Sequence, residues 1–181
     1  MEDSSYPELV EHFVQAAQIA AATVEVVNRD AQSLNYALVK NTVDDKEVIL
    51  SLPVDLSSAL FSVFMNNKKV ITEPSKEQFA NIKTGITDAF CGIASTGSVC
   101  VPMTNGLSSP ASMLTRKHIV VVDAQTIIPR PRDVFSEKYL SGKGLKRSFS
   151  FITGPSATAD MGPLVRGVHG PEKLHIIVIE G

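Results

Sequence analysis

Hydrophobic positions at helical spacing open the chain. Residues 8–22 predict an amphipathic helix, because their apolar side chains recur on one face at Leu9, Phe13, Ala17 and Ala20. The next segment, TVEVVN at residues 23–28, is rich in β-branched residues and predicts a short strand.

The alternation of helix and strand continues through residue 73. Asp30 stands before an apolar-periodic segment and predicts the N-cap of a helix over 31–41. A buried strand over 47–52, a helix over 54–65 and a strand over 68–73 follow. This rhythm is typical of a parallel sheet with helices on both faces.

The middle of the chain interrupts the rhythm. Two short apolar runs flank the tripeptide STG, and we expect an antiparallel hairpin with strands at roughly 89–95 and 98–102. Gly97 can adopt the positive φ that tight hairpin turns need. A turn at Ser95–Thr96 would set Cys91 opposite Cys100, whereas the turn favoured here, at Thr96–Gly97, sets Cys91 opposite Pro102.

The second half returns to strands and helices. We expect a loop over 104–112, a buried strand over 117–124 and a helix over 132–142 that ends at Gly142. The last strands are expected at 148–153 and 173–181, with a short helix over 159–167 between them. The predicted fold class is a single α/β domain over residues 1–181, with a mainly parallel sheet covered on both faces and one antiparallel hairpin.

Composition excludes several classes of protein. With 181 residues, a formal net charge of -2 and no strong basic block, the chain is not expected to bind nucleic acid. It has no apolar run long enough to span a membrane, and its acidic start does not resemble a secretory signal, so a cytoplasmic location is expected.

Cofactor and metal sites are not expected either. The two cysteines are too few for an iron–sulfur cluster and lack zinc spacing, so we expect reduced thiols without a disulfide. The histidines are scattered, and His12, His118 and His175 are interpreted as structural residues. Motifs for a hydrolase nucleophile, a nucleotide phosphate or a dinucleotide are missing from the sequence. We therefore expect no metal and no cofactor held by this chain.

The segment TGPSATAD, residues 153–160, is the first candidate for chemistry. Gly154 allows close approach of the backbone to a ligand, Ser156 and Thr158 can donate hydrogen bonds, and the expected helix start offers free N–H groups to an anion. Asp160 is a first-turn carboxylate or a base beside the pocket. The alternative is that the hydroxyls only cap the helix.

Two further loops complete the predicted pocket. Thr96, Gly97 and Ser98 would form a facing wall at the carboxyl ends of the strands, unless they form a plain hairpin turn. His169 and Gly170 lie in the loop GVHGP, where the imidazole either binds an anion or only stabilises a turn. The expected ligand is a small carboxylate or phosphate, bound more tightly as the pH falls toward about 6.

These segments together resemble a known family. DAFCGIASTGSV, HIVVVDAQTIIP, SFITGPSATADM and GVHGPEKLHIIVIE occur in this order in the LUD family of LutC/YkgG-like lactate utilization proteins. The resemblance runs from about residue 84 to the end. It implies a fold similar to the ribose-phosphate isomerase and CoA-transferase group, which is a three-layer open sandwich with a mainly parallel sheet. It also implies a role in the bacterial oxidation of L-lactate to pyruvate beside iron–sulfur subunits.

The chain departs from the family pattern at three positions. Many relatives carry an acidic residue where this chain has Ser95, an arginine where it has Ala157 and a glutamate where it has Gly162. An arginine is a natural bidentate partner for a carboxylate, so its loss shifts binding to backbone N–H groups and hydroxyls.

Three functions remain open. The chain is a subunit or accessory protein of lactate oxidation, or a stand-alone enzyme acting on a sugar phosphate or acyl-CoA, or a metabolite-sensing module. The enzyme would need a catalytic carboxylate, which Asp88 or Asp160 would supply. The sequence leaves open whether the chain is catalytic by itself, and a homo-oligomer is compatible with it.

Overall fold

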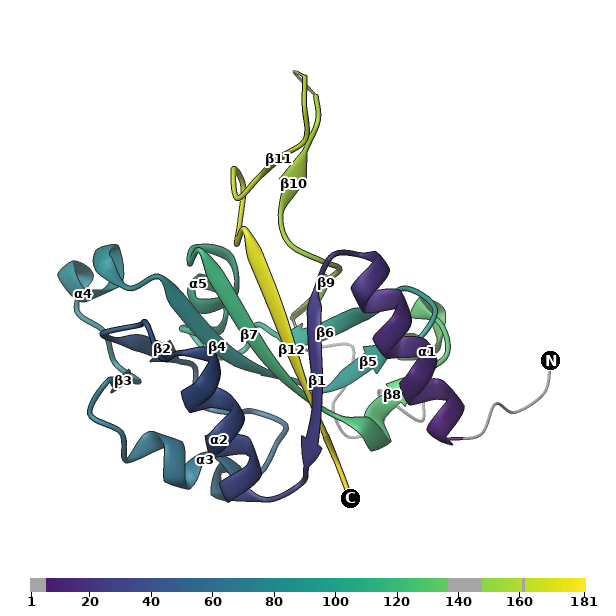
Figure 1. The fold of residues 1–181 in the computed structure, drawn as a ribbon, viewed down its shortest axis with the longest axis horizontal. Coiled ribbons are helices and arrows are strands. Elements are labelled where there is room, and N and C mark those ends of the chain that lie inside the picture. Colours follow the sequence, from purple (N-terminus) through teal and green to yellow (C-terminus); the bar gives the residue numbers. More distant parts are fainter. Residues whose placement is uncertain (1–5, 137–147, 161) are drawn as a thin grey trace.

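A six-stranded sheet forms the centre of the computed structural model, which describes residues 6–136, 148–160 and 162–181 (Figure 1). Every neighbouring pair of its strands is parallel. In spatial order the strands are β1 (Thr23–Asn28), β12 (Lys173–Glu180), β7 (Lys117–Asp123), β4 (Thr84–Ala89), β2 (Val48–Leu50) and β3 (Val70–Ile71). The predicted α/β class is confirmed.

Helices α2 (Ala31–Asn41) and α3 (Ser58–Met65) cover one face of this sheet. Asp30 is the N-cap of α2, as predicted, and its carboxylate accepts hydrogen bonds from the backbone N–H groups of Gln32 and Ser33. Alternate residues of β7 and β12 point into this layer, where Ile119, Val121, Ile177 and Ile179 are fully buried. The predicted burial of the last strand is confirmed.

Helix α1 (Tyr6–Ile19) and a four-stranded sheet cover the opposite face. The strands of this second sheet, in spatial order, are β8 (Ile127–Ile128), β5 (Cys91–Ile93), β6 (Ser98–Pro102) and β9 (Phe149–Ile152). Phe13 and Ala17 of α1 are fully buried between the two sheets. The described chain contains no helix with the length and apolar character needed to cross a bilayer.

Several predicted boundaries are wrong. Residues 84–89 form β4 of the parallel sheet, a separate strand from the hairpin, and all six are buried. The expected loop over 104–112 contains α5 (Ser108–Met113), and an unpredicted helix α4 (Lys76–Asn81) precedes β4. Short 3-10 turns η1 (Ala124–Thr126) and η2 (Pro131–Phe135) follow β7. The rest of the helix expected over 132–142 lies outside the described residues.

The hairpin adopts the register that we did not favour. Ile93 pairs with Ser98 and Cys91 with Cys100, so four residues connect the strands and Gly97, at φ 62°, ends the turn. The Gly97 N–H donates to the Ile93 carbonyl at 2.9 Å, which closes this longer loop. Both thiols are free and buried. Contact with the Cys91 thiol, together with burial, raises the pKa of Cys100.

A two-stranded arm replaces the helix expected over 159–167. Strands β10 (Ala157–Thr158) and β11 (Val165–Arg166) pair antiparallel, and the arm projects from the body of the molecule (Figure 1). Gly162 precedes a proline, which disfavours the helical conformation at that residue. The helix start that was expected to attract an anion near Ala159 is therefore absent from the described chain.

Two glycines allow loops to press against the end of α1. A Cβ atom on Gly97 would lie 2.1 Å from the Ala17 nitrogen, and one on Gly154 would lie 2.0 Å from the Ala20 carbonyl oxygen. Gly154 also has a left-handed φ of 65°. The hairpin turn and the loop after β9 thus converge on the same stretch of helix backbone.

Replacing Gly154 with alanine should destabilise the protein by on the order of 3 kcal/mol, since a left-handed alanine and a clash with rigid backbone add together. Urea unfolding monitored by circular dichroism gives the value. Gly106→Ala is the matched control, because no atom lies within 4 Å of a Cβ there. It should change the free energy of unfolding by less than about 0.5 kcal/mol. Equal losses in the two variants would contradict the packing role of Gly154.

Ala21→Gly should instead stabilise the protein. Ala21 follows α1 with a left-handed φ of 66°, while the Ala22 N–H bonds back to the Ala17 carbonyl at 2.9 Å. This is the helix-end geometry in which glycine is usual. Relief of the strain should outweigh the larger chain entropy of glycine by about 0.5–1 kcal/mol. Ala80→Gly, inside α4 at an exposed position, should lose a similar amount in the same unfolding assay.

Candidate functional site

The two predicted loops meet through Thr153, which was not among the hydroxyls expected to bind a ligand. Ser98 Oγ lies 2.6 Å from Thr96 Oγ1 and 2.6 Å from Thr153 Oγ1, which joins the hairpin turn to the loop after β9. Ser98 is buried. Its hydroxyl can donate only one hydrogen bond, so a directed chain of three hydroxyls runs through it. The adjacent Gly97 and Gly154 have a packing role against α1, and a ligand role for them stays a prediction.

This cluster lies at the edge of the sheet where the parallel strands begin, the amino edge. We expected it at the carboxyl edge, where the strands end. The arm returns to the body through Pro171 and Glu172, and the next residue, Lys173, begins β12. β12 and β1 are parallel, so the loops around the arm surround the starts of these strands (Figure 1). The rule that ligands lie beyond the carboxyl ends of open sheets does not describe this cluster.

The base of the arm is held by backbone hydrogen bonds. The Ser156 N–H donates to the Pro171 carbonyl at 2.8 Å, and the Gly167 N–H donates to the Ser156 carbonyl at 3.0 Å. Gly170 packs beside the Ser156 side chain, since a Cβ there would lie 3.2 Å from Ser156 Cβ. The two sides of the arm are therefore fixed to each other where it leaves the body.

The remaining predicted site residues lie farther along the arm. Thr158 belongs to β10 and pairs with Val165, and Asp160 is exposed near the turn. The structure therefore divides the nine predicted residues between a hydroxyl cluster against α1 and the arm.

A cavity of about 380 Å³ lies at the base of the arm. Two of the predicted residues, His169 and Gly170, line it together with residues from the connection between α5 and β7. The full lining is Met113, Leu114, Thr115, Arg116, Gly167, Val168, His169, Gly170 and Glu172. The predicted loop histidine and a cation, Arg116, thus line the same cavity.

That cation, Arg116, was missed in the sequence. Its side chain is 73% exposed, and its Nη1 atom lies 4.0 Å from Glu172 Oε2. So long and exposed a contact leaves most guanidinium donors available. The sequence does contain a weak signal for Arg116. This residue directly precedes the buried strand β7, so it lies at the amino edge of the sheet, where the arm also lies.

Asp88, one of the carboxylates that an enzyme would need, has a structural task at the opposite edge. It is buried at the end of β4, and its Oδ2 atom accepts backbone hydrogen bonds of 2.9, 2.7 and 3.0 Å from Val54, Asp55 and Leu56. Burial raises its pKa, and the three hydrogen bonds only partly oppose that rise. Asp88 thereby fixes the loop that leads into α3.

His118 is a core residue, as expected. It is fully buried in β7, and its Nε2 atom lies 2.8 Å from Thr87 Oγ1. Burial lowers its pKa to about 3, so it is neutral at physiological pH. Within the described residues no group of three or more histidine, cysteine or acidic side chains is arranged to hold a metal ion.

Comparison with known proteins identifies relatives. Residues 10–179 match the model of the LUD domain. Lactate utilization protein C of Halalkalibacterium halodurans is 38% identical over 100 residues, which are 53% of this chain and 44% of that protein. YkgG of Escherichia coli is 25% identical over 180 residues, 93% of this chain and 78% of that protein. The chain spans about half the length of the lactate utilization proteins it matches.

A solved structure has the same fold. The crystal structure of a DUF162 family protein from Deinococcus radiodurans superposes with a TM-score of 0.73 over 99% of this chain and 100% of that chain, at 20% identity. The family match covers nearly all described residues, including α1, both sheets and the arm. On this evidence the chain belongs to the LUD domain family.

Proposed function

We propose that this protein is a subunit or accessory protein in the oxidation of L-lactate to pyruvate, and that it binds a small carboxylate in the cavity at the base of the arm. The relatives named Lactate utilization protein C support the pathway. In this proposal, iron–sulfur subunits of the lactate oxidation system carry the electrons, and this chain holds or senses the organic acid.

The pairing of Arg116 and His169 in one cavity is the observation that carries the proposal. A guanidinium binds a carboxylate through two parallel hydrogen bonds, and a protonated imidazole adds a second positive donor. Arg116 thus supplies the cation that position 157 lacks, from a different element of the fold.

The other walls of the cavity suit a small organic acid. Met113, Leu114 and Val168 bring apolar side chains beside Arg116. Lactate and pyruvate each carry a methyl group next to their carboxylate, so one end of either molecule would contact the apolar wall and the other the cation. Inorganic phosphate has no apolar end and should bind less tightly than these acids at equal charge.

Glu172 tunes the site in this proposal. Its Oε2 atom lies 4.0 Å from Arg116 Nη1. A bound acid would compete with Glu172 for the guanidinium, so binding would displace a weak ion pair. Glu172→Gln should therefore tighten the binding of a carboxylate.

Isothermal titration with L-lactate, pyruvate and phosphate tests the site. Arg116→Gln should weaken lactate and pyruvate binding about tenfold or more, which corresponds to about 1.4 kcal/mol for a lost charged hydrogen bond. Arg132→Gln is the matched control, because Arg132 is equally exposed at 72% but lies in η2, outside the cavity lining. His169→Gln should also weaken the binding of both acids, because it removes the second donor of the proposed site.

Two results would overturn the binding site: no heat of binding at millimolar acid, or equal affinity in wild type and Arg116→Gln. The role in lactate oxidation needs its own assay. Lactate-dependent electron transfer by the purified partner subunits should increase when this chain is added, and less so with Arg116→Gln. Turnover by this chain alone would favour the stand-alone enzyme instead.

A further inference from the structure

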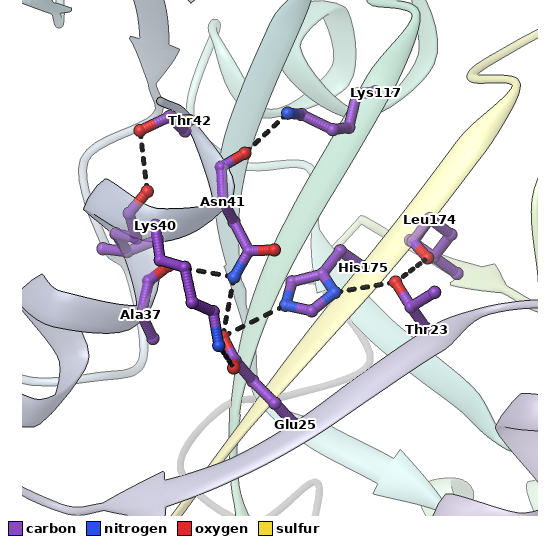
Figure 2. Close-up of polar contacts among 10 residues, drawn as sticks. Thr23, Glu25, Ala37, Lys40, Asn41, Thr42, Lys117, Leu174 and His175 are labelled. Carbon is purple, nitrogen blue, oxygen red and sulfur yellow. Dashed lines mark hydrogen bonds and ion pairs between the residues drawn. The ribbon is translucent and has the colours of Figure 1, made fainter. Parts of the chain in front are cut away.

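A second polar cluster lies on the other face of the sheet, between β1, β12 and α2 (Figure 2). His175 Nδ1 lies 2.7 Å from Thr23 Oγ1, and His175 Nε2 lies 3.3 Å from Glu25 Oε1. Thr23 and His175 are direct neighbours in the parallel register of β1 and β12. The three side chains form a line from hydroxyl to imidazole to carboxylate.

Two residues of α2 fix the carboxylate end of this line. Asn41 Nδ2 donates to Glu25 Oε1 at 2.7 Å, and the Lys40 ammonium forms an ion pair with Glu25 Oε2 (Figure 2). Burial alone would raise the pKa of Glu25, but the contacts with Lys40 and His175 outweigh it and lower that pKa. Glu25 is therefore ionised at neutral pH and can only accept hydrogen bonds.

The ionised carboxylate decides where the protons lie. His175 must carry its proton on Nε2 to donate to Glu25, which leaves Nδ1 as an acceptor in the neutral ring. Burial, which outweighs the attraction of Glu25, lowers the pKa of His175, so the neutral ring prevails at neutral pH. The Thr23 hydroxyl then donates to Nδ1, since its other acceptor, the Leu174 carbonyl, is farther away at 3.4 Å.

Thr23 is more exposed to solvent than His175 and Glu25, as a reactive hydroxyl requires. The His175 side chain is only 12% exposed and Glu25 only 19%, whereas Thr23 is an exposed residue at the start of β1. The oxygen atom is therefore open to a reagent from solvent, while its base is shielded. This order of groups matches that of an activated nucleophile, its base and the group that orients the base.

An exposed lysine shares the strand face of the histidine. Lys173 is exposed and stands two residues before His175 in β12, so both side chains leave the same face of the sheet. The neighbouring Lys117 pairs with Lys173 in the register, but its ammonium is bound by the Asn41 carbonyl at 2.6 Å and by Asp45 at 3.2 Å. Lys173 thus supplies an exposed cation on the same face of the sheet as the cluster.

We propose that Thr23, His175 and Glu25 form an acyl-transfer site in which Thr23 accepts an acyl group from an activated ester bearing a carboxylate. Thr23 Oγ bonds to the carbonyl carbon while its proton passes to His175 Nδ1. The carbon–oxygen bond to the leaving group then breaks, and the leaving oxygen takes the proton from His175. The product is an ester on Thr23, and no oxidant or reductant is needed. Glu25 is a positioning residue that holds the ring and its tautomer.

The probe is mono-p-nitrophenyl succinate, with p-nitrophenyl acetate as the neutral comparison. Wild-type protein should release p-nitrophenolate in a burst of one equivalent, and peptide mass spectrometry should place the acyl group on Thr23. Thr23→Val should abolish this label and Thr23→Ser should retain it. His175→Gln should slow the burst about a hundredfold. Lys173→Gln should remove the preference for the succinate ester.

Thr104→Val is the matched control, because Thr104 is exposed and has no hydrogen-bonded imidazole. It should leave the burst unchanged. The burst rate should fall in acid, because His175 gains a proton and can no longer act as a base. The charged groups that influence the pKa of His175 are Glu25, Lys40 and Lys117. Melting curves establish that each variant is folded.

Labelling of lysines alone, or labelling of Thr23 at the same rate in folded His175→Gln, would overturn the proposal. A merely structural cluster would change the melting temperature without producing the burst or its acid limb. The site shares no residue with the cavity at the base of the arm, so this experiment and the acid titration fail or succeed independently.

Discussion

The close approach of two loops to the end of helix α1 is the constraint on which the arrangement of the candidate sites depends. Gly97 brings the hairpin turn onto Ala17, and Gly154 brings the loop after β9 onto Ala20. A side chain at either position would fit only if the neighbouring backbone moved. The contact fixes the four-stranded sheet against α1 and directs the chain after β9 into the arm. Without it, the arm that carries His169 would not be held at the cavity that Arg116 also lines.

The charged side chains at the two edges of the parallel sheet differ in pairing and in exposure to solvent. At the carboxyl edge, acidic side chains hold the fold together: Asp88 binds the loop before α3, and Asp123 pairs with Arg29 at 2.9 Å. At the amino edge, Lys173 and Arg116 are exposed. Charges that are already paired and buried are poor ligands, because a substrate would have to replace good hydrogen bonds. The available chemistry therefore lies at the starts of the strands.

The sequence predicted the local elements well where one force dominates. Apolar periodicity gave α1, α2, β7 and β12, and the capping carboxylate of Asp30 gave the start of α2. Prediction from the sequence failed where contacts between residues far apart in the chain determine the structure. The hairpin register depends on the contact between Gly97 and α1, and local turn preferences hold no information about that contact. A short helix was expected over 159–167, where the structure has the arm, and the Gly162–Pro163 step is the local signal against that helix. His169 was found from its glycine-rich loop, whereas Arg116 could be recognised only after the arm had been placed.

The start of β12 connects the two candidate sites across the sheet. Pro171 and Glu172 belong to the base of the arm, Lys173 and His175 face the α2 layer, and Leu174 between them packs on the α1 side. Side chains alternate along a strand, so successive residues of β12 serve different layers of the fold. β12 is central in the sheet and hydrogen-bonded along its length to β1 and β7, which holds this stretch of backbone in place. The two candidate sites therefore share one short stretch of backbone, residues 171–175, and no side chain, and the Ser156–Pro171 hydrogen bond fixes where the arm joins it.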